Sequence, residues 1–509
     1  MLGQPIQNIV IVGGGTAGWN AAALLVRMMS RVISITLVES EEIGIVGVGE
    51  ATIPPVIRFN NALGLNEDDF LKSTQGSIKL GIQFENWGEL GDSYMHAFGD
   101  VGRDFAFCPF HNFWVRSQQL GIEADFWDFS PNYQAAVRHK FGKVSSRSGT
   151  SDGGLPYAYH FDAGLYAKYL RGYCESQGIT RVEGIVDHSS TCSDTGFIKS
   201  LTLKSGKEIE GDLFLDCSGF RGLLIEQALQ TGYEEWSHWL PCDRAVAVPS
   251  ESTGPIRPYT RSIAHKAGWQ WNIPLQHRTG NGHVYCSSYV SDDEACHTLL
   301  SHLEGPPLAE PRQIPFKTGR RKLQWNKNVV ALGLASGFLE PLESTSIHLI
   351  QTGIRRLMDN FPHQGIRQID IDAFNKQSKL EFEQIRDFII LHYKINQRTD
   401  SQFWVNCRNM SIPDTLEQKI ELFKHSGRVL RYSDELFAEV AWYQVMLGQG
   451  LIPDDYHPIA DSLSEQQMLR MFAELRAMVG DTVSQLPTHD QFLASVTQQQ
   501  LRTSSAASA

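Results

Sequence analysis

A β-strand, a glycine-rich turn, a helix and a second strand follow one another near the start of the sequence. Residues 9–12 (IVIV) are a short β-branched run that suits a buried parallel strand. The stretch 13–18 (GGGTAG) comes next, and residues 19–29 are compatible with a helix rich in alanine and leucine. Residues 32–38 (VISITLV) predict a second strand, which ends at Glu39. This order predicts a βαβ unit of a parallel sheet.

Three glycines of the turn have the GxGxxG spacing of a dinucleotide-binding loop. Gly13 permits the tight turn, Gly15 allows the backbone to approach a pyrophosphate, and Gly18 allows close packing of helix on strand. Glu39 follows ~20 residues later, where a carboxylate can bind the ribose hydroxyls. Such glycines also occur in ordinary turns, but strand, helix, strand and acid together favour dinucleotide binding. The motif does not separate NAD from FAD, although its place near the N-terminus favours FAD.

Charge and cysteine content exclude several classes of protein. The 509 residues carry a formal net charge of -12, which disfavours nucleic acid or an anionic membrane as the partner. The eight cysteines show no CxxC pair or zinc-type spacing, so we expect no metal site and reduced thiols in a cytoplasmic protein. No apolar run approaches the ~18 residues of a membrane span, and no signal peptide is expected. The polar stretch 497–509 is predicted to be a disordered tail.

A set of short motifs along the chain resembles one enzyme family. Residues 269–274 (WQWNIP) form a WxWxIP pattern, which would also suit a strand with two aromatic residues on one face. Four further motifs accompany it, namely GVGEATIP at 47–54, SIKLGIQFENW at 77–87, LDCSGFRG at 215–222 and GFLEPLESTS at 337–346. With the GxGxxG loop, these segments are similar to those of flavin-dependent halogenases of the tryptophan halogenase family. The C-terminal third matches the family more loosely.

The resemblance implies a halogenase that uses FAD, as FADH2, with O2 and chloride or bromide. In the family, the halide is oxidised to hypohalous acid, which moves through a tunnel to an electron-rich aromatic substrate. A separate NADH-dependent flavin reductase is implied, because the chain has no obvious NADH-binding domain. The oligomeric state, monomer or homodimer, stays open. The residues expected at the cofactor are Gly13, Gly15, Thr16, Ala17, Gly18, Glu39, Val48, Ala51, Ile185, Leu339 and Ile347.

Lys79 lies in the segment that matches the family's essential lysine. Ile78, Leu80, Ile82 and Phe84 alternate with polar or small residues, which predicts one strand with one apolar face. A lysine on the other face is ordinarily exposed to solvent. The resemblance implies instead that Lys79 holds or captures hypohalous acid beside the substrate ring. Burial would lower the pKa of its ammonium group and raise its reactivity.

Glu343 lies just before a predicted helix that begins near Thr345. An acidic residue at this point can simply complement a helix N-terminus. The resemblance implies instead that Glu343 hydrogen-bonds hypohalous acid or accepts the proton that the ring loses. The backbone N–H groups at Thr345 and Ser346 are expected to bind the halide. The family often has glycine where Ser346 stands, so the halide preference is open, with bromide favoured because it is easier to oxidise.

Residues 88–150 are rich in aromatic residues, glycine and histidine, and most of the aromatic side chains are expected to form core. His96 and Phe98 resemble the His-x-Phe pair that lines the indole pocket in the family. Trp269 and Trp271 are expected either to shield the flavin from organic substrate or to pack in the core. No loop resembles the clamp that holds an amino acid's carboxylate and ammonium. We therefore expect indole or a simple derivative as the substrate, and poor use of free tryptophan.

The expected fold class is α/β, or α+β overall, with a Rossmann-like FAD-binding domain round a parallel sheet and a largely helical substrate part. The FAD-binding part is expected to span residues 1–365 discontinuously, with a substrate-pocket insertion at about 88–150. Residues 366–496 are expected to be the helical part, because 374–393 and 463–479 have apolar residues at helical spacing. Two alternatives remain. One is an aromatic monooxygenase, which needs neither the WxWxIP pattern nor the motif lysine, and the other is a non-catalytic flavin-binding protein.

Overall fold

The computed structural model describes residues 5–43, 49–143 and 154–496. The contacts within the chain separate two compact units, each assembled from three stretches of sequence. Unit 1 comprises Met1–Gly76, Phe161–Asp243 and Pro315–Glu383, and unit 2 comprises Ser77–His160, Arg244–Ile314 and Gln384–Ala509. The predicted tail, 497–509, lies outside the described residues.

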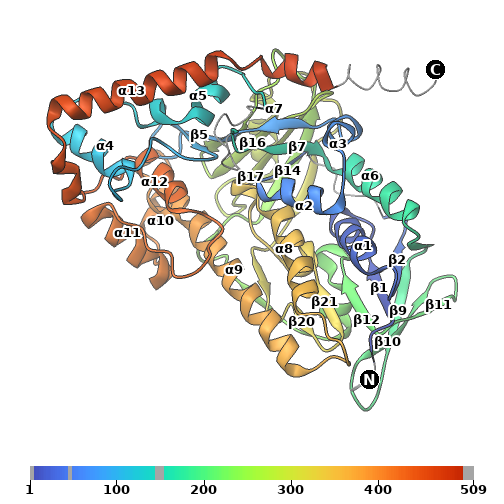
Figure 1. Cartoon of the computed structure of the whole chain (residues 1–509). Coiled ribbons are helices and arrows are strands. Elements are labelled where there is room, and N and C mark those ends of the chain that lie inside the picture. The colour runs from blue at the N-terminus through green and yellow to red at the C-terminus, as the bar shows by residue number, and fades with distance from the viewer. Residues whose placement is uncertain (1–4, 44–48, 144–153, 497–509) are drawn as a thin grey trace. The chain divides into compact units, whose positions relative to one another are not determined.

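Unit 1 is built on a mostly parallel sheet with the strand order β20-β21-β12-β1-β2-β8 (Figure 1). All neighbours from β21 to β8 pair in parallel, whereas β20 is antiparallel to β21. The helix α1 (Thr16–Met29) connects β1 to β2, which confirms the predicted βαβ unit. The strands are β20 (Trp325–Asn326), β21 (Val329–Ala331), β12 (Leu213–Asp216), β1 (Asn8–Val12), β2 (Ser34–Glu39) and β8 (Thr180–Glu183).

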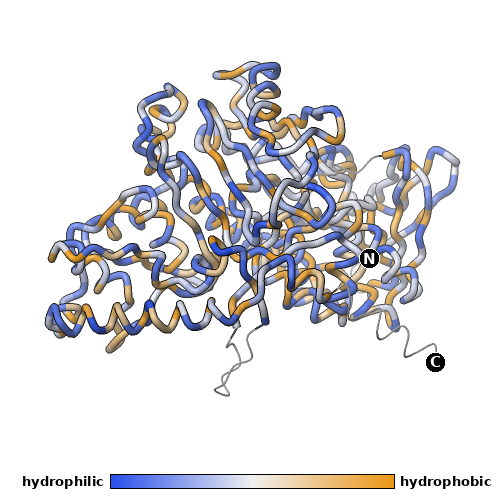
Figure 2. The backbone as a smooth tube through the Cα atoms, turned by 90° about the horizontal axis from the view of Figure 1, so that it is seen from above, coloured by the Kyte–Doolittle hydropathy of each residue, from blue (hydrophilic) through white to orange (hydrophobic). Residues whose placement is uncertain are grey.

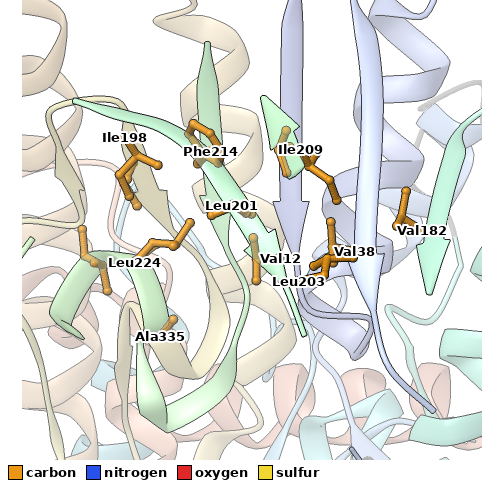
Figure 3. Close-up of a cluster of buried hydrophobic side chains, with 14 residues drawn as sticks. Val12, Val38, Val182, Ile198, Leu201, Leu203, Ile209, Phe214, Leu224 and Ala335 are labelled. Atoms are coloured by element: carbon orange, nitrogen blue, oxygen red, sulfur yellow. The ribbon is translucent and has the colours of Figure 1, made fainter. Parts of the chain in front are cut away.

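A small antiparallel sheet covers one face of the parallel sheet. It has the order β11-β10-β9, with β11 (Glu208–Glu210), β10 (Ile198–Leu203) and β9 (Val186–Thr191). Figure 3 shows Val12, Val38 and Val182 of the parallel strands beside Leu201 and Ile209 of this sheet, in one buried cluster. Because side chains alternate along β1, the face opposite Val12 is left for α1.

Unit 1 also contains short strands and helices outside the two sheets just described. They are β3 (Gly49–Ala51), α2 (Pro55–Leu63), α3 (Glu67–Ser73), α6 (Ala163–Ser176), the 3-10 helix η2 (Gly219–Arg221), the π-helix η3 (Leu223–Ala228), β13 (Tyr233–Glu235), β19 (Gly319–Arg321), the 3-10 helix η4 (Gly333–Ala335), β22 (Gly337–Phe338), the 3-10 helix η5 (Pro341–Glu343) and α8 (Ser346–Asp359). Of these, α6 and α8 pack against α1. The strands β13, β19 and β22 form their own antiparallel sheet.

Unit 2 contains a large sheet with the order β18-β14-β17-β16-β15-β5-β6. The β15–β5 pair is parallel, and the pairs β14–β17, β17–β16, β16–β15 and β5–β6 are antiparallel. The strand β16 carries the WxWxIP pattern, and all of its residues are buried. The strands are β18 (Arg312–Pro315), β14 (Arg244–Ser250), β17 (Thr279–Tyr285), β16 (Gly268–Pro274), β15 (Thr260–His265), β5 (Gly81–Glu85) and β6 (Ser93–Ala97).

Outside this sheet, unit 2 contains one short strand pair and helices. The strand β4 (Ser77–Lys79) pairs antiparallel with β7 (Ala158–Asp162). The long helix α9 (Gln368–Lys394) begins in a stretch of unit 1 and ends in a stretch of unit 2. The other helices are α4 (Phe110–Gln119), the 3-10 helix η1 (Phe126–Phe129), α5 (Pro131–Val137), α7 (Asp292–Ser301), α10 (Gln402–Asn409), α11 (Asp414–Ser426), α12 (Glu439–Gly448), the 3-10 helix η6 (Pro458–Ser462) and α13 (Glu465–Ser484).

Hydrophobic stretches along the backbone are short and are interrupted by hydrophilic residues (Figure 2). Within the described ranges, no helix has the length and apolar character that crossing a membrane requires. The eight cysteines are all free thiols, and most of them are buried.

Candidate active site

The glycine loop after β1 is shaped by two close backbone approaches. A Cβ on Gly13 would lie 2.3 Å from the carbonyl oxygen of Cys217, and the φ of Gly13 is +117°, which favours glycine. A Cβ on Gly18 would lie 1.8 Å from the carbonyl oxygen of Gly13. Both positions therefore require glycine for the fold itself, in the roles that the motif predicts.

Gly15 is different, because a Cβ built on it would meet no atom within 4 Å among the described residues outside its own chain neighbours. It stands at the N-cap of α1, and no side chain caps this helix. The N–H groups of the first turn, which begins at Thr16, are thus available to an anion at the positive end of the helix dipole. Open space over a glycine and a helix N-terminus together fit the pyrophosphate of FAD.

Glu39 ends β2 beside this loop, as expected for a residue that binds ribose. Arg181 Nε donates to Glu39 Oε1 at 2.5 Å, so one carboxylate oxygen is already held by a cation. The other oxygen, Oε2, faces the loop, because a Cβ built on Gly14 would lie 1.5 Å from it. The Gly184 N–H donates to the Glu39 carbonyl at 2.8 Å, which brings the next residue, Ile185, to the end of β2.

The other residues expected at the cofactor lie in three segments of unit 1. Ala17 in the first turn of α1 is close to η4, because a Cβ built on Gly333 would lie 2.7 Å from the Ala17 Cβ. Ala51 is buried in β3, and Leu339 and Ile347 are buried on either side of η5. Val48 lies outside the described residues. Contact of these side chains with FAD stays a prediction.

Glu343 is the last residue of η5 and is buried. Ser344 follows in the left-handed conformation, with φ at 58°, and turns the chain from η5 into α8. Thr345 is the N-cap of α8, so the predicted helix start near this residue is confirmed. The buried carboxylate of Glu343 therefore lies two residues before Thr345, the N-cap of α8.

The first turn of α8 contains both residues expected at the halide. Thr345 is 1% exposed, and within the described part of the chain its Oγ1 has no hydrogen-bond partner. Ser346 is half-buried and is the first residue of the helix. A buried hydroxyl and first-turn amides are donors that suit an anion. Halide binding at these residues stays a prediction.

Lys79 ends β4 in unit 2 and has no exposed surface. Its Nζ lies 5.4 Å from the centroid of the Phe98 ring, so the structure brings together two residues that the sequence predicted for the site. The expectation of one continuous strand is wrong, because the chain leaves β4 at Leu80 and continues as β5 in another sheet. The Leu80 N–H donates to the Pro258 carbonyl at 2.7 Å, and its carbonyl accepts from the Phe98 N–H at 2.8 Å.

His96 lies in an aromatic cluster that the sequence did not indicate. Its ring centroid is 5.7 Å from that of Phe388 in α9 and 6.1 Å from that of Phe437, just before α12. Phe388 and Phe437 stack at 3.9 Å with an interplanar angle of 21°. The segments are far apart in sequence. The helical spacing of apolar residues at 374–393 predicted only a buried face around Phe388, and no pattern indicated Phe437. These two phenylalanines are therefore additional candidates for the wall of an aromatic pocket.

A buried ion pair fixes the segment that leads to Phe437. Lys419 Nζ of α11 lies 3.0 Å from Glu435 Oε1, and both side chains are almost fully buried. Lys419 also donates to the carbonyl of Leu430 and lies 5.1 Å from the Trp442 ring centroid. These two charges satisfy each other, so neither remains to hold a charged group of a ligand.

The two tryptophans of the WxWxIP strand are buried and have different neighbours. Trp269 lies 6.4 Å, between ring centroids, from Trp87, in the aromatic core of unit 2. The Trp271 ring covers Gly282, since a Cβ there would lie 2.0 Å from it. The Trp271 indole nitrogen has no hydrogen-bond partner within the described residues. Core packing accounts for Trp269, and flavin shielding stays a prediction for both residues.

No group of His, Cys, Asp or Glu in the described ranges could hold a metal ion. The candidate residues therefore consist of a dinucleotide loop and a carboxylate in unit 1, and of a buried lysine with aromatic neighbours in unit 2.

Comparison with known proteins finds relatives that match nearly the whole chain. The sequence model of the tryptophan halogenase family matches residues 8–465. The tryptophan 6-halogenase SttH of Streptomyces toxytricini is 34% identical over 529 residues, which cover 97% of this chain and 98% of the relative.

Two solved structures are also similar. A flavin-dependent halogenase from Xanthomonas campestris superposes with a TM-score of 0.94 at 47% identity, covering 97% of this chain and 99% of that one. The flavin-dependent halogenase BrvH from Brevundimonas sp. BAL3 superposes with a TM-score of 0.93 at 46% identity, covering 96% and 99%.

Proposed function

This chain belongs to the tryptophan halogenase family, and we propose that it halogenates a small indole by means of Lys79 and Glu343. It is a flavin-dependent halogenase that uses reduced FAD and a halide, and its substrate is aromatic. The observation that carries the proposal is the fully buried Lys79, whose Nζ lies 5.4 Å from the Phe98 ring centroid.

The cofactor would be held by the glycine loop and the N-terminus of α1. FAD, once reduced by a separate flavin reductase, supplies with O2 the two-electron oxidation of halide to hypohalous acid. Gly15 leaves space for the pyrophosphate, and the first-turn amides neutralise its charge. Glu39 Oε2 accepts from a ribose hydroxyl while Arg181 holds the other oxygen. The amides at Thr345 and Ser346 bind the halide.

Lys79 would hold the hypohalous acid. Its ammonium donates a hydrogen bond to the oxygen of the acid, which weakens the oxygen–halogen bond towards attack by the ring. A carbon–halogen bond forms, the oxygen–halogen bond breaks, and the oxygen leaves as hydroxide. In a buried, aromatic environment this donation is stronger than in water. An ammonium has three donors, so it can orient the acid and keep a second partner.

Glu343 would complete the substitution. The ring carbon that receives the halogen must lose its proton, and a buried carboxylate is a base that can accept it. The proton finally combines with the hydroxide, so the products are halogenated indole and water. Glu343 ends η5 and is followed by the turn into α8, so the backbone fixes where its buried carboxylate begins.

The mutual pairing of the buried Lys419 and Glu435 favours a neutral substrate. Lys419 and Glu435 are paired with each other and buried, and His96 is flanked by phenylalanines. Free tryptophan would need partners for its carboxylate and ammonium, and leaving both unpaired costs several kcal/mol. The tryptophan 6-halogenase SttH, at 34% identity, is also less similar to this chain than the flavin-dependent halogenases from Xanthomonas campestris and Brevundimonas, at 47% and 46%.

The test supplies FAD, a flavin reductase, NADH, O2 and bromide, with equal concentrations of indole and L-tryptophan. We expect bromoindole by mass spectrometry and little brominated tryptophan. Lys79→Ala should lower the rate at least about a thousandfold, or ~4 kcal/mol, with FAD affinity unchanged. Glu343→Gln keeps the shape without the base and should slow the reaction strongly, but less than Lys79→Ala. Lys207→Ala, at an exposed lysine, is the control and should behave as wild type.

Each alternative outcome has a distinct meaning. Hydroxyindole in place of bromoindole would support an aromatic monooxygenase. Bound flavin without any product, at either halide, would support a non-catalytic flavin protein. A normal rate from Lys79→Ala would refute the role of this lysine. Consumption of tryptophan before indole would contradict the substrate assignment alone.

A further inference from the structure

His160 lies at the centre of a hydrogen-bond chain beside Lys79. It is fully buried on β7, and its register partner on β4 is Ser77. His160 Nδ1 is 3.1 Å from Ser77 Oγ, and Nε2 is 2.9 Å from Thr260 Oγ1 on β15. Ser77 Oγ in turn donates to the carbonyl oxygen of Pro274, at the end of the WxWxIP strand, at 2.5 Å. The chain therefore connects the lysine strand to two strands of the large sheet.

The direction of these bonds fixes the state of the His160 ring. Ser77 has a single hydroxyl proton, and this proton is directed at the Pro274 carbonyl. Ser77 Oγ can then only accept from His160, so Nδ1 carries the ring proton. His160 Nε2 is left as an acceptor for the Thr260 hydroxyl. A neutral imidazole with its proton on Nδ1 satisfies every polar atom of the chain.

The groups that face His160 also favour the neutral ring. Burial lowers the pKa of His160 well below its ordinary value of 6.5, and the nearby Lys79 and His489 lower it further. Burial likewise lowers the pKa of His489 to about 4. His160 and His489 are therefore neutral at neutral pH and add no positive charge beside Lys79.

The residues on both sides of Lys79 are held by bonds from distant segments. Ser77 is held by the chain just described. The Ile78 N–H donates to His489 Nε2 at 3.1 Å, and His489 Nδ1 donates to a backbone carbonyl at 2.9 Å. The Leu80 N–H donates to the Pro258 carbonyl at 2.7 Å. Among the strands that the structure describes, β4 pairs with β7, and these bonds add to that pairing in holding the backbone of Lys79 in place.

We propose that His160 is a positioning residue for Lys79, which acts through the Ser77 hydroxyl to hold the lysine strand against the WxWxIP strand. This inference rests on the proposed catalytic role of Lys79. A shift of the Lys79 ammonium by about 1 Å would cost on the order of a hundredfold in the chemical step. Binding of flavin and of indole would be little affected, because His160 contacts neither in this assignment.

Two amide substitutions separate the two sides of the ring. The side-chain nitrogen of asparagine takes the place of Nδ1, so His160→Asn keeps a donor to Ser77 and loses the bond to Thr260. The amide of glutamine reaches the place of Nε2, so His160→Gln keeps a partner for Thr260 and loses the donor to Ser77. The two variants differ by one methylene group and retain the same polar group.

The assay measures bromination of indole, with kcat and KM determined separately, and hypohalous acid released to a trapping reagent. We expect His160→Asn to keep kcat within about threefold of wild type. His160→Gln should lower kcat by about ten- to a hundredfold, with KM for indole and Kd for FAD changed less than about twofold. Hypohalous acid should then escape to the trap, because it is formed but not used.

Two control variants distinguish a loss of positioning from a loss of stability. His283→Asn makes the same chemical change at another buried histidine of unit 2, which bonds to the Ala295 carbonyl. It should lower stability without lowering kcat. Ser77→Ala removes the linking hydroxyl and should reproduce the effect of His160→Gln, so it replaces that variant if His160→Gln fails to fold.

Equal and near-normal kcat in His160→Gln and Ser77→Ala, with Lys79→Ala inactive, would overturn this inference and leave the proposed function intact. Activity in Lys79→Ala would overturn the proposed function and this inference with it. A uniform fall in kcat for His160→Asn, His160→Gln and His283→Asn, in proportion to lost stability, would reduce His160 to a structural role and also overturn the proposal.

Discussion

At the scale of single residues, Gly15 offers a clean test of the cofactor site. Apart from its chain neighbours, no described residue has an atom within 4 Å of the Cβ that a substitution would add, so Gly15→Val should leave the fold of the free protein intact. The valine side chain would instead occupy the space assigned to the pyrophosphate. We expect the Kd for FAD to rise at least about a hundredfold, or ~3 kcal/mol, with little change in unfolding temperature. Fluorescence titration and thermal unfolding measure the two effects.

Gly18 supplies the contrast to Gly15. A Cβ there would meet the Gly13 carbonyl at 1.8 Å, so Gly18→Val should prevent the first helix from packing and destabilise the protein before any cofactor binds. If Gly15→Val bound FAD with unchanged affinity, the assignment of the pyrophosphate to this loop would be wrong.

The sequence could predict such residues only where local geometry sets their role. The three glycines and Glu39 follow from a turn between adjacent strands, and the structure confirms the turn. The burial of Lys79 did not follow from its own neighbours, which suggested an exposed position, and depended on the resemblance to the family. His160 and Phe437 were not predicted at all, because their contacts with Ser77 and His96 join segments distant in sequence.

At the scale of elements, the break at Leu80 shows what periodicity misses. Alternation from Ile78 to Phe84 predicted one strand, and every apolar residue of it is indeed buried. The structure divides it into β4 and β5 because the chain changes partners at Leu80. Residues 77–79 pair with β7, whereas the Leu80 carbonyl accepts from the Phe98 N–H, in register with the β5–β6 pair. An alternating pattern predicts that one face of a strand is buried. It does not indicate which strand pairs with that strand.

The segment before α12 is held by the ion pair of Lys419 and Glu435, and its removal tests that element. Lys419→Met leaves the Glu435 carboxylate buried without its cation, which costs about 3–5 kcal/mol. We expect a lower unfolding free energy in urea and a raised KM for indole, because Phe437 follows this segment. Replacing both partners, Lys419→Met with Glu435→Gln, should recover part of the loss.

Arg355→Ala is the matched control for this pair. Its partner Asp359 is exposed, as is Arg355 itself, and such pairs contribute less than about 1 kcal/mol. An unchanged KM and stability in Lys419→Met would show that the segment does not depend on the buried pair.

At the scale of the whole molecule, the division into two units could not be read from the sequence. Each unit is assembled from three stretches, and the parallel sheet of unit 1 takes strands from near residues 10, 180, 214 and 330. The order of strands in such a sheet depends on which crossovers pack, and local patterns do not specify it. The helical character of the chain after residue 368 was predictable, because its apolar residues recur at helical spacing over long runs.

Buried histidines should make unit 2 sensitive to acid. Burial lowers the pKa of His111, His283 and His489 to about 4 and that of His265 to about 3, from an ordinary 6.5. The unfolded chain therefore binds more protons than the folded chain at pH values between the lowered pKa of each ring and 6.5. The stability contributed by the neutral rings is complete above pH 6.5 and falls as the pH drops through 6.5 towards 4. Shifts of this size correspond to up to about 3 kcal/mol for each ring with a pKa of about 4 and up to about 5 kcal/mol for His265.

The acid sensitivity can be assigned by measuring urea unfolding between pH 8 and pH 4.5 with and without one of these rings. The unfolding free energy of wild type should fall steadily below pH 6.5. His283→Asn should be less stable at pH 8, because asparagine is smaller than the buried ring and leaves part of its space empty. Its further loss towards pH 4.5 should be smaller by about 2–3 kcal/mol, because one titrating group has been removed. Identical slopes in wild type and His283→Asn would contradict the assignment of acid sensitivity to His283, whose ring is buried.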